Sequence, residues 1–169
     1  PNPVFLNLDV IKIHWYGFLI ALGALLGFFV FYKLARQKKL ISKKKIFDLV
    51  FWLVIWGVIG ARLYHVFSEL AYYLSNPLKI FYIWNGGLGI YGAILASLIV
   101  IWFFVHKTSL SSARSTTPDK RLIRNKYFHI LDLLAPALAL GQTIGRWGNY
   151  FNQELYGLPS NLPWSIPIS

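Results

Sequence analysis

The stretch "IHWYGFLIALGALLGFFVFYKL", residues 13–34, decides the fold because almost every side chain in it is apolar. A helix needs about 20 such residues to cross the hydrocarbon core of a bilayer. Three more stretches of this kind follow, and we expect each to span the membrane, at residues 46–67, 88–105 and 127–144. The sequence therefore predicts an all-α integral membrane protein, a polytopic helical bundle in one transmembrane domain over residues 1–169.

The composition excludes most classes of soluble protein. Hydrophobic residues make up 56% of the chain and the mean hydropathy is +0.51, whereas only 14% of the residues are charged. Soluble domains contain about 25% charged residues. The chain has no cysteine, so it has no disulfide, no thiolate metal site and no cysteine nucleophile of its own. Nothing in the sequence indicates a metal or a cofactor, and we expect neither.

The net charge of +11 is concentrated in two short connections between the apolar stretches. Seven of the 17 lysines and arginines lie in residues 33–45, and six more lie in residues 107–126. Because basic loops of membrane proteins face the cytoplasm, we expect residues 33–45 and 106–126 on the cytoplasmic side and the N-terminus outside. These charges then orient the chain and contact the headgroups of anionic membrane lipids; we expect no nucleic-acid partner.

The connection between the second and third stretches, "SELAYYLSNPLKIFYIWNGG" at residues 68–87, is rich in aromatic residues. Tyrosine and tryptophan favour the headgroup level of a bilayer. An Asn-Pro pair at 76–77 interrupts the segment, and an Asn-Gly-Gly run at 85–87 indicates a turn. We expect one or two interfacial helices here, on the outer side of the membrane.

A polar stretch, "GRWGNYFNQELYG" at residues 145–157, follows the fourth apolar stretch and by this topology lies toward the outer leaflet. Arg146 and Arg62 both fall near the outer ends of their predicted helices, where a buried cation needs an anionic partner. Glu154 can neutralise one of the two. The other remains a receptor for an anion, because a guanidinium binds a phosphate or carboxylate through two hydrogen bonds. In the outer leaflet the obvious anion is a lipid phosphate.

Two interpretations of this polar stretch stay open. Either Arg146 and Glu154 form a buried ion pair and nothing more, or both belong to a pocket for a ligand. Asn149, Asn152 and Gln153 favour the pocket, since a single ion pair does not need three carboxamides around it. On a helix, Asn149 and Gln153 would also lie three and seven residues after Arg146, on the same face.

Tyr16 and Tyr91 also lie near the outer ends of predicted helices, where tyrosine is common as an interfacial anchor. Tyr91 is the stronger functional candidate, because four of its neighbours, at positions 86, 87, 89 and 92, are glycines. Each glycine lowers helix propensity by about 1 kcal/mol. In exchange it permits close approach of a backbone or a ligand.

These residues resemble the prolipoprotein diacylglyceryl transferases of the bacterial inner membrane, whose signature is similar to Gly-Arg-x-Gly-Asn-Phe-x-Asn-x-Glu-x-x-Gly. With Tyr150 in place of Phe, seven positions match in register: Gly145, Arg146, Gly148, Asn149, Asn152, Glu154 and Gly157. The similarity extends over essentially the whole chain through "HWYG" at 14–17, "GARLYHV" at 60–66, "WNGGLGIYG" at 84–92 and "YGLPSNLPW" at 156–164.

The resemblance implies a multi-pass enzyme of the inner membrane. Such an enzyme transfers the diacylglyceryl group of phosphatidylglycerol to the lipobox cysteine in the signal peptide of a prolipoprotein, forming a thioether and releasing glycerol phosphate. The catalytic residues that the resemblance implies are Arg146, Tyr91 and Glu154. The substrate-binding residues that it implies are Arg146, Asn149, Asn152, Gly157, Tyr16 and Arg62.

This chain departs from the family in two respects. Many members carry a histidine where it has Tyr91, the group expected to take the thiol proton. Members of the family are also longer, so we expect this chain to be an N-terminal portion, truncated at its C-terminus and inactive by itself. The alternative function is a non-catalytic membrane protein that binds anionic lipid, or a transport subunit.

Overall fold

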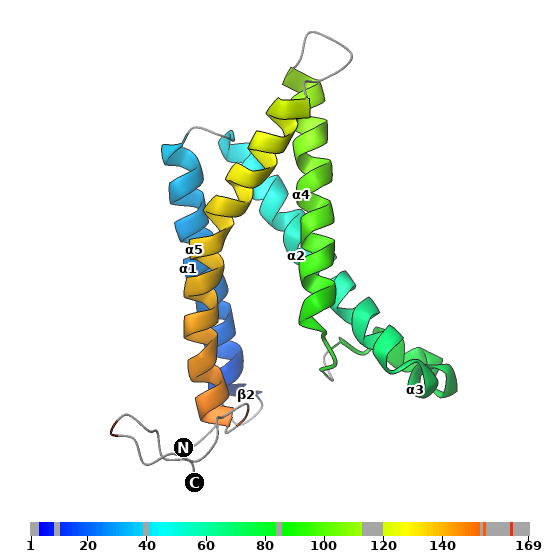
Figure 1. Ribbon diagram of the computed structural model, residues 1–169. Helices are drawn as coiled ribbons and strands as arrows, with labels where there is room; N and C mark the ends of the chain where they lie inside the picture. Colours follow the sequence, from blue (N-terminus) through cyan, green and yellow to red (C-terminus); the bar gives the residue numbers. More distant parts are fainter. Residues whose placement is uncertain are drawn as a thin grey trace. The chain divides into compact units, whose positions relative to one another are not determined.

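The computed structural model describes residues 4–8, 11–38, 41–83, 86–112, 120–152, 154 and 163. Four long helices dominate this part of the chain, and each is long and apolar enough to cross a membrane. The prediction of an all-α polytopic membrane protein is thereby confirmed. Figure 1 shows the elements, which are β1 (Val4–Leu8), β2 (Ile11–His14), α1 (Trp15–Gln37), α2 (Lys43–Ser68), α3 (Leu70–Ser75), the 3-10 helix η1 (Pro77–Phe81), α4 (Ile90–Ser112) and α5 (Lys120–Asn152).

The chain divides into two compact units. One comprises Pro1–Leu34 and Asp132–Ser169, and the other comprises Ala35–Leu131. The division within α5 coincides with a break in its hydrogen bonding. Pro136 lies inside this helix and has no N–H, so the carbonyl of Asp132, four residues earlier, loses its helical partner.

In the first unit, small residues bring α1 and the second half of α5 into close contact. A methyl group on Gly23 would lie 3.0 Å from the carbonyl oxygen of Gly141, and one on Gly27 would lie 2.9 Å from that of Ala137. Two glycines four residues apart occupy one helix face and let the backbones approach. The repeated small residues in these two helices therefore serve helix packing.

A short antiparallel hairpin, β1–β2, precedes α1 and was not anticipated from the sequence. Leu8 pairs with Ile11 and Leu6 with Ile13, and the register shifts between Val4 and Leu6. The sequence signal was the alternation of apolar and polar residues in "LNL" at 6–8 and "IKIH" at 11–14, which is typical of strands. The ring of Phe5 packs on α1, with its centroid 4.4 Å from that of Trp15.

In the second unit, α2 and α4 pack along one another. Their closest approach is at Gly60 and Gly92, where a methyl group on Gly60 would lie 2.5 Å from the Gly92 carbonyl oxygen and 2.5 Å from the Ala96 Cβ. Gly57, one turn earlier on α2, has more room, since the nearest atom to its added methyl group is 3.8 Å away. Of these two glycines, Gly60 is therefore the one at the tight α2–α4 contact.

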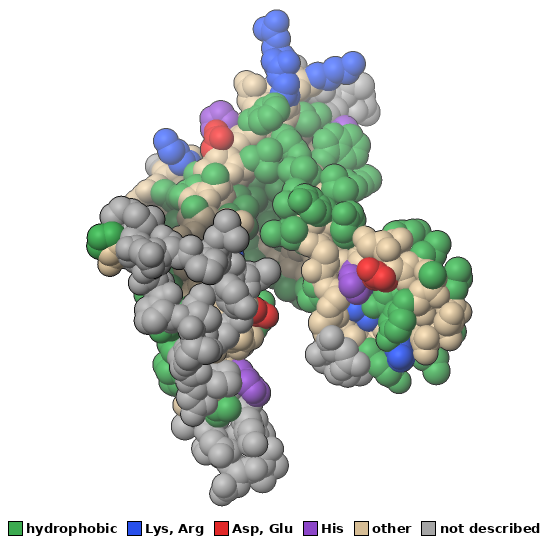
Figure 2. Space-filling model, turned by 60° about the horizontal axis from the view of Figure 1, so that its bottom comes forward, with side chains coloured by type: hydrophobic (Ala, Val, Ile, Leu, Met, Phe, Trp, Pro, Cys, Tyr) green, Lys and Arg blue, Asp and Glu red, His purple; other side chains and the backbone are tan. Residues whose placement is uncertain are grey.

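Large apolar side chains point outward from all four long helices, as expected where the surroundings are lipid rather than water. Leu25 on α1, Val54 on α2, Phe103 on α4 and Leu138 on α5 each expose more than 60% of their surface. Figure 2 shows green side chains covering much of the visible, described surface. The apolar surface therefore lies where hydrocarbon can cover it.

We expect Gly60→Ala to destabilise the protein, because a methyl carbon cannot lie 2.5 Å from a carbonyl oxygen, the distance that it would have to that of Gly92. Forcing extra volume into a packed contact costs about 1–3 kcal/mol. The measurement is the midpoint of thermal unfolding in detergent. Gly57→Ala on the same helix is the matched control and should leave the midpoint unchanged; an equal shift in both variants would contradict this account of the packing.

Candidate functional site

The polar stretch begins inside a helix, because α5 continues eight residues beyond the predicted end of the fourth apolar stretch and ends at Asn152. Arg146 and Asn149 thus lie one turn apart on the same helix. The side chain of Arg146 is exposed and makes no hydrogen bond or ion pair with another described residue. Its guanidinium therefore keeps its donors available for an anion.

Tyr16, at the start of α1, contacts the same turn of α5. A methyl group on Gly148 would lie 3.0 Å from Cδ2 of Tyr16, so only glycine fits at this position without displacing the ring. One residue earlier, the ring of Trp15 stacks on that of Phe151, with centroids 4.7 Å apart. The structure thereby brings Tyr16 beside the turn that carries Arg146, although 129 residues separate the two in the sequence.

Glu154 follows the helix and helps to end it. Its backbone N–H donates to the carbonyl of Asn149 at 3.0 Å, a bond that satisfies one of the last carbonyls of α5. Its carboxylate accepts a hydrogen bond of 3.4 Å from the Asn152 amide. No ion pair links Glu154 to Arg146 among the described residues, so the interpretation of this stretch as a buried ion pair gains no support. Gln153 and Gly157, the other predicted residues of the stretch, lie outside the described residues.

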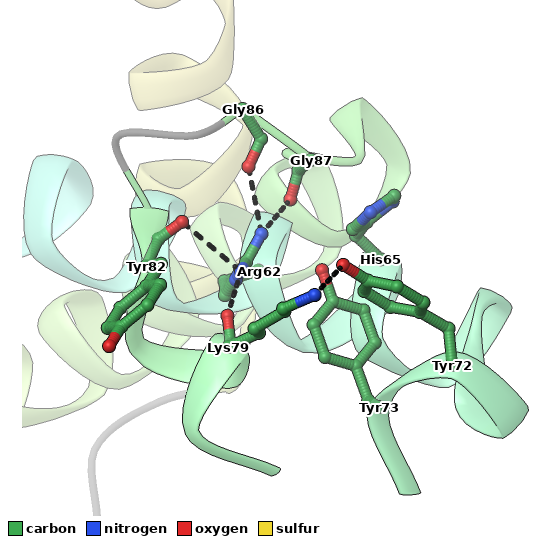
Figure 3. A pocket seen from close by; sticks show the side chains of 8 residues that line it. All are labelled: Arg62, His65, Tyr72, Tyr73, Lys79, Tyr82, Gly86 and Gly87. Atoms are coloured by element: carbon green, nitrogen blue, oxygen red, sulfur yellow. Dashed lines mark hydrogen bonds between the residues drawn. The ribbon is translucent and has the colours of Figure 1, made fainter. Parts of the chain in front are cut away.

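Arg62, near the end of α2, donates five hydrogen bonds to backbone carbonyls in the second unit. It is buried, with 7% of its surface exposed. Its Nε donates to the Ile80 carbonyl at 2.9 Å, and its two terminal nitrogens donate to the carbonyls of Gly86, Gly87, Lys79 and Tyr82. A guanidinium has five N–H groups, and all five are used. Figure 3 shows the four bonds of the terminal nitrogens.

These five bonds fasten the segment 79–87 to the end of α2. Gly86 and Gly87 have positive φ values of 83° and 72°, a backbone region that glycine enters without steric cost. A methyl group on Gly87 would also lie 2.8 Å from a terminal nitrogen of Arg62. Only glycine therefore lets the backbone turn around the guanidinium here.

The segment that Arg62 holds leads directly into α4, so it also determines where Tyr91 lies. The Gly89 N–H donates to the carbonyl of Ala61 at 2.9 Å, and α4 begins at Ile90. Tyr91 is 64% exposed, and its ring lies 5.7 Å from that of Tyr64. Tyr91 is therefore exposed in the first turn of α4.

The predicted residues therefore fall into two groups. Tyr16, Arg146 and the Asn149–Glu154 segment belong to the first unit, and Arg62 and Tyr91 belong to the second. The sequence did not indicate that Lys79 lies beside Arg62, or that backbone carbonyls are the hydrogen-bond partners of Arg62. Every residue has a carbonyl, and the sequence does not show in which direction it points. No cluster of three His, Asp or Glu residues able to hold a metal ion occurs in the described parts of the chain.

Comparison with known proteins identifies the chain. The family profile described as prolipoprotein diacylglyceryl transferase matches residues 3–169. A phosphatidylglycerol–prolipoprotein diacylglyceryl transferase of Finegoldia magna is 43% identical over 158 residues, which cover 94% of this chain and 57% of the relative. Proteins with the same description from Gloeobacter violaceus and Synechococcus elongatus are 38% and 39% identical, over 99% of this chain and 57% and 53% of their own lengths.

Four helices that are long and apolar enough to cross a membrane define the class, a polytopic membrane protein. The chain belongs to the prolipoprotein diacylglyceryl transferase family. It spans about half the length of the curated relatives it matches.

Proposed function

We propose that the protein, in its full-length form, transfers the diacylglyceryl group of phosphatidylglycerol to the lipobox cysteine of a prolipoprotein. The sulfur forms a bond to the glyceryl carbon that carried the phosphate. The bond between that carbon and the phosphate oxygen breaks, and glycerol phosphate leaves with the electron pair. The observation that carries this proposal is Arg146, an exposed arginine with no partner among the described residues, in the family's signature.

Arg146 supplies the charge that this reaction needs. Negative charge grows on the departing phosphate oxygen, and donors fixed near it lower the barrier. Asn149 and Asn152 add neutral donors from the same end of α5, and Glu154 holds the Asn152 amide through the 3.4 Å bond. Tyr16 packs at Gly148 and forms one wall beside these donors. Gly157 completes the proposed set from its match to the signature.

The thiol proton has to reach a base before or during the attack. We assign this role to Tyr91, which is 64% exposed at the start of α4. Arg62 fixes the segment before it, and its five donors are occupied by carbonyls. Its proposed contribution to substrate binding is therefore through its charge and through the position of Tyr91.

The proposed orientation follows from the basic connections. Residues 33–45 and 106–126 face the cytoplasm of the bacterial inner membrane, since positive loops are retained on that side. The N-terminus, α3, η1 and the end of α5 then lie on the outer side. The prolipoprotein signal peptide reaches the site within the membrane, together with the lipid donor.

The proposal predicts that reconstituted full-length protein modifies a lipobox peptide only when phosphatidylglycerol is the donor lipid. Mass spectrometry of the peptide measures the gain of one diacylglyceryl group, and the released glycerol phosphate is measured in parallel. A peptide with serine in place of the lipobox cysteine and vesicles of phosphatidylethanolamine are the two controls. Absence of transfer from phosphatidylglycerol, while the protein remains folded, would refute the proposal.

A further inference from the structure

Tyr64 lies one turn before the end of α2 and contacts the start of α4. It follows Gly60 by four residues, so both residues lie on the same face of α2. That face packs along α4 (Figure 1), and Gly60 and Gly92 bring the two backbones into contact there. A tyrosine ring at the next turn would separate the two helices unless the start of α4 made room for it.

Two glycines at the start of α4 make this room. A methyl group on Gly92 would lie 2.5 Å from Cβ of Tyr64, and one on Gly89 would collide with Cδ1 of its ring. The backbone at this point is fixed, because the Gly89 N–H donates to the carbonyl of Ala61 at 2.9 Å. Packed atoms do not approach so closely, so a larger residue at either position would displace the ring. The two glycines therefore fix the position of the Tyr64 ring.

The ring of Tyr64 also contacts the side chain of Tyr91. Their centroids lie 5.7 Å apart and their planes are tilted by 51°, which is a favourable arrangement for two aromatic rings. Tyr91 is 64% exposed, and it makes no other ring contact and no hydrogen bond with the described residues. Exposed side chains change rotamer rapidly. The contact with Tyr64 therefore restricts the conformations of Tyr91 on one side.

We propose that Tyr64 is a positioning residue for Tyr91, and that its ring holds the Tyr91 hydroxyl where the lipobox thiol reaches it. This inference rests on the proposed function, in which Tyr91 takes the thiol proton. Tyr64 itself takes no proton. Its role belongs to the ring, because ring atoms make the contacts with Gly89 and Tyr91.

Kinetics of the full-length reconstituted protein test this role. Tyr64→Phe keeps the ring and should transfer at the wild-type rate. Tyr64→Leu removes the ring and should lower kcat about 10–100-fold, because a catalytic group displaced by about 1 Å loses rate on this scale. Its KM for phosphatidylglycerol should stay unchanged, since the chemical step is affected and not lipid binding. Phe67→Leu, at a position that is 72% exposed on the same helix, is the matched control and should change neither constant.

A second measurement observes Tyr91 without any reaction. The probe is meta-fluorotyrosine incorporated at position 91, and its fluorine resonance is recorded in detergent. Tyr64→Leu should shift this resonance, because the neighbouring ring is lost, whereas Phe67→Leu should not. Because this signal does not depend on transfer, absence of transfer by the wild type would refute the proposed function and would still leave the positioning of Tyr91 measurable.

Gly89→Ala provides a second variant in which Tyr64 itself is retained. Its methyl group would displace the Tyr64 ring, so we expect a loss of kcat and a shifted fluorine resonance, as in Tyr64→Leu. The midpoint of thermal unfolding shows which variants are folded, and Gly89→Ala decides the question if Tyr64→Leu is not. Wild-type kcat in the folded variants would overturn the proposal. A loss of kcat that Tyr64→Phe shares, or one that leaves the fluorine resonance unchanged, would overturn it as well.

Discussion

Arg146→Ala is expected to lower kcat for diacylglyceryl transfer by about 10²–10³-fold, because it removes one donor that stabilises charge in the transition state. The substitution leaves the fold intact, because the Arg146 side chain is exposed and has no partner among the described residues. Exposed substitutions of this kind change stability by about 0.5 kcal/mol or less. The measurement is the initial rate of peptide modification with reconstituted full-length protein.

Two further variants sharpen this experiment. Arg146→Lys keeps the charge but loses the planar pair of donors that fits a phosphate, so its rate should lie between those of the wild type and Arg146→Ala. Arg124→Ala removes another exposed arginine from α5 and is the control for loss of charge alone. Turnover at the wild-type rate by Arg146→Ala would remove this residue from the mechanism.

The four membrane helices could be predicted from the sequence because their signal is local. About 20 consecutive apolar residues are typical of a membrane-spanning helix, and charged residues indicate where the apolar stretch ends. The end of the fourth helix was less predictable. Polarity begins at Arg146, yet the helix runs on to Asn152, because a helical backbone bonds to itself whether or not its side chains are apolar.

The candidate site was predictable only in part, for a related reason. Arg146 and Asn149 are three residues apart in the sequence, so helical periodicity placed them on one face. The contact of Tyr16 with Gly148 depends on packing between two distant helices, which one sequence does not reveal. For Arg62, the sequence predicted an anionic partner. The structure instead supplies five carbonyls from residues 79–87.

The contrast between the two arginines follows from their surroundings. Arg146 is exposed and unpartnered within the described chain, so an anion can reach its donors. Arg62 is 7% exposed and uses every donor on backbone oxygens, so its hydrogen bonds serve the loop. Two residues of the same type at predicted helix ends therefore have different roles, and burial together with bonding distinguishes them.

Arg62→Lys should destabilise the protein by about 3 kcal/mol or more, the effect of breaking a buried charged network. A lysine ammonium has three donors on one atom. It cannot reach both the carbonyls of Lys79 and Tyr82 and those of Gly86 and Gly87, which the guanidinium bonds from two different nitrogens. The measurement is the midpoint of thermal unfolding in detergent. Arg36→Lys, at an exposed position near the end of α1, is the matched control and should not shift it.

The same variant should also slow transfer, because Gly89 and Tyr91 follow directly on the segment that Arg62 holds. The loss is expected mainly in kcat, since a misplaced base slows the chemical step more than it weakens lipid binding. Arg62→Ala provides the sharper test, because it leaves a cage of five carbonyls that free guanidinium can occupy. Partial recovery of the transfer rate with millimolar guanidinium, but not with equal sodium chloride, is the expected result. If Arg62→Lys matches the wild type in both stability and kcat, the guanidinium does not hold the segment 79–87. The position of Tyr91 then depends on the α2–α4 packing at Gly60 and Gly92 alone.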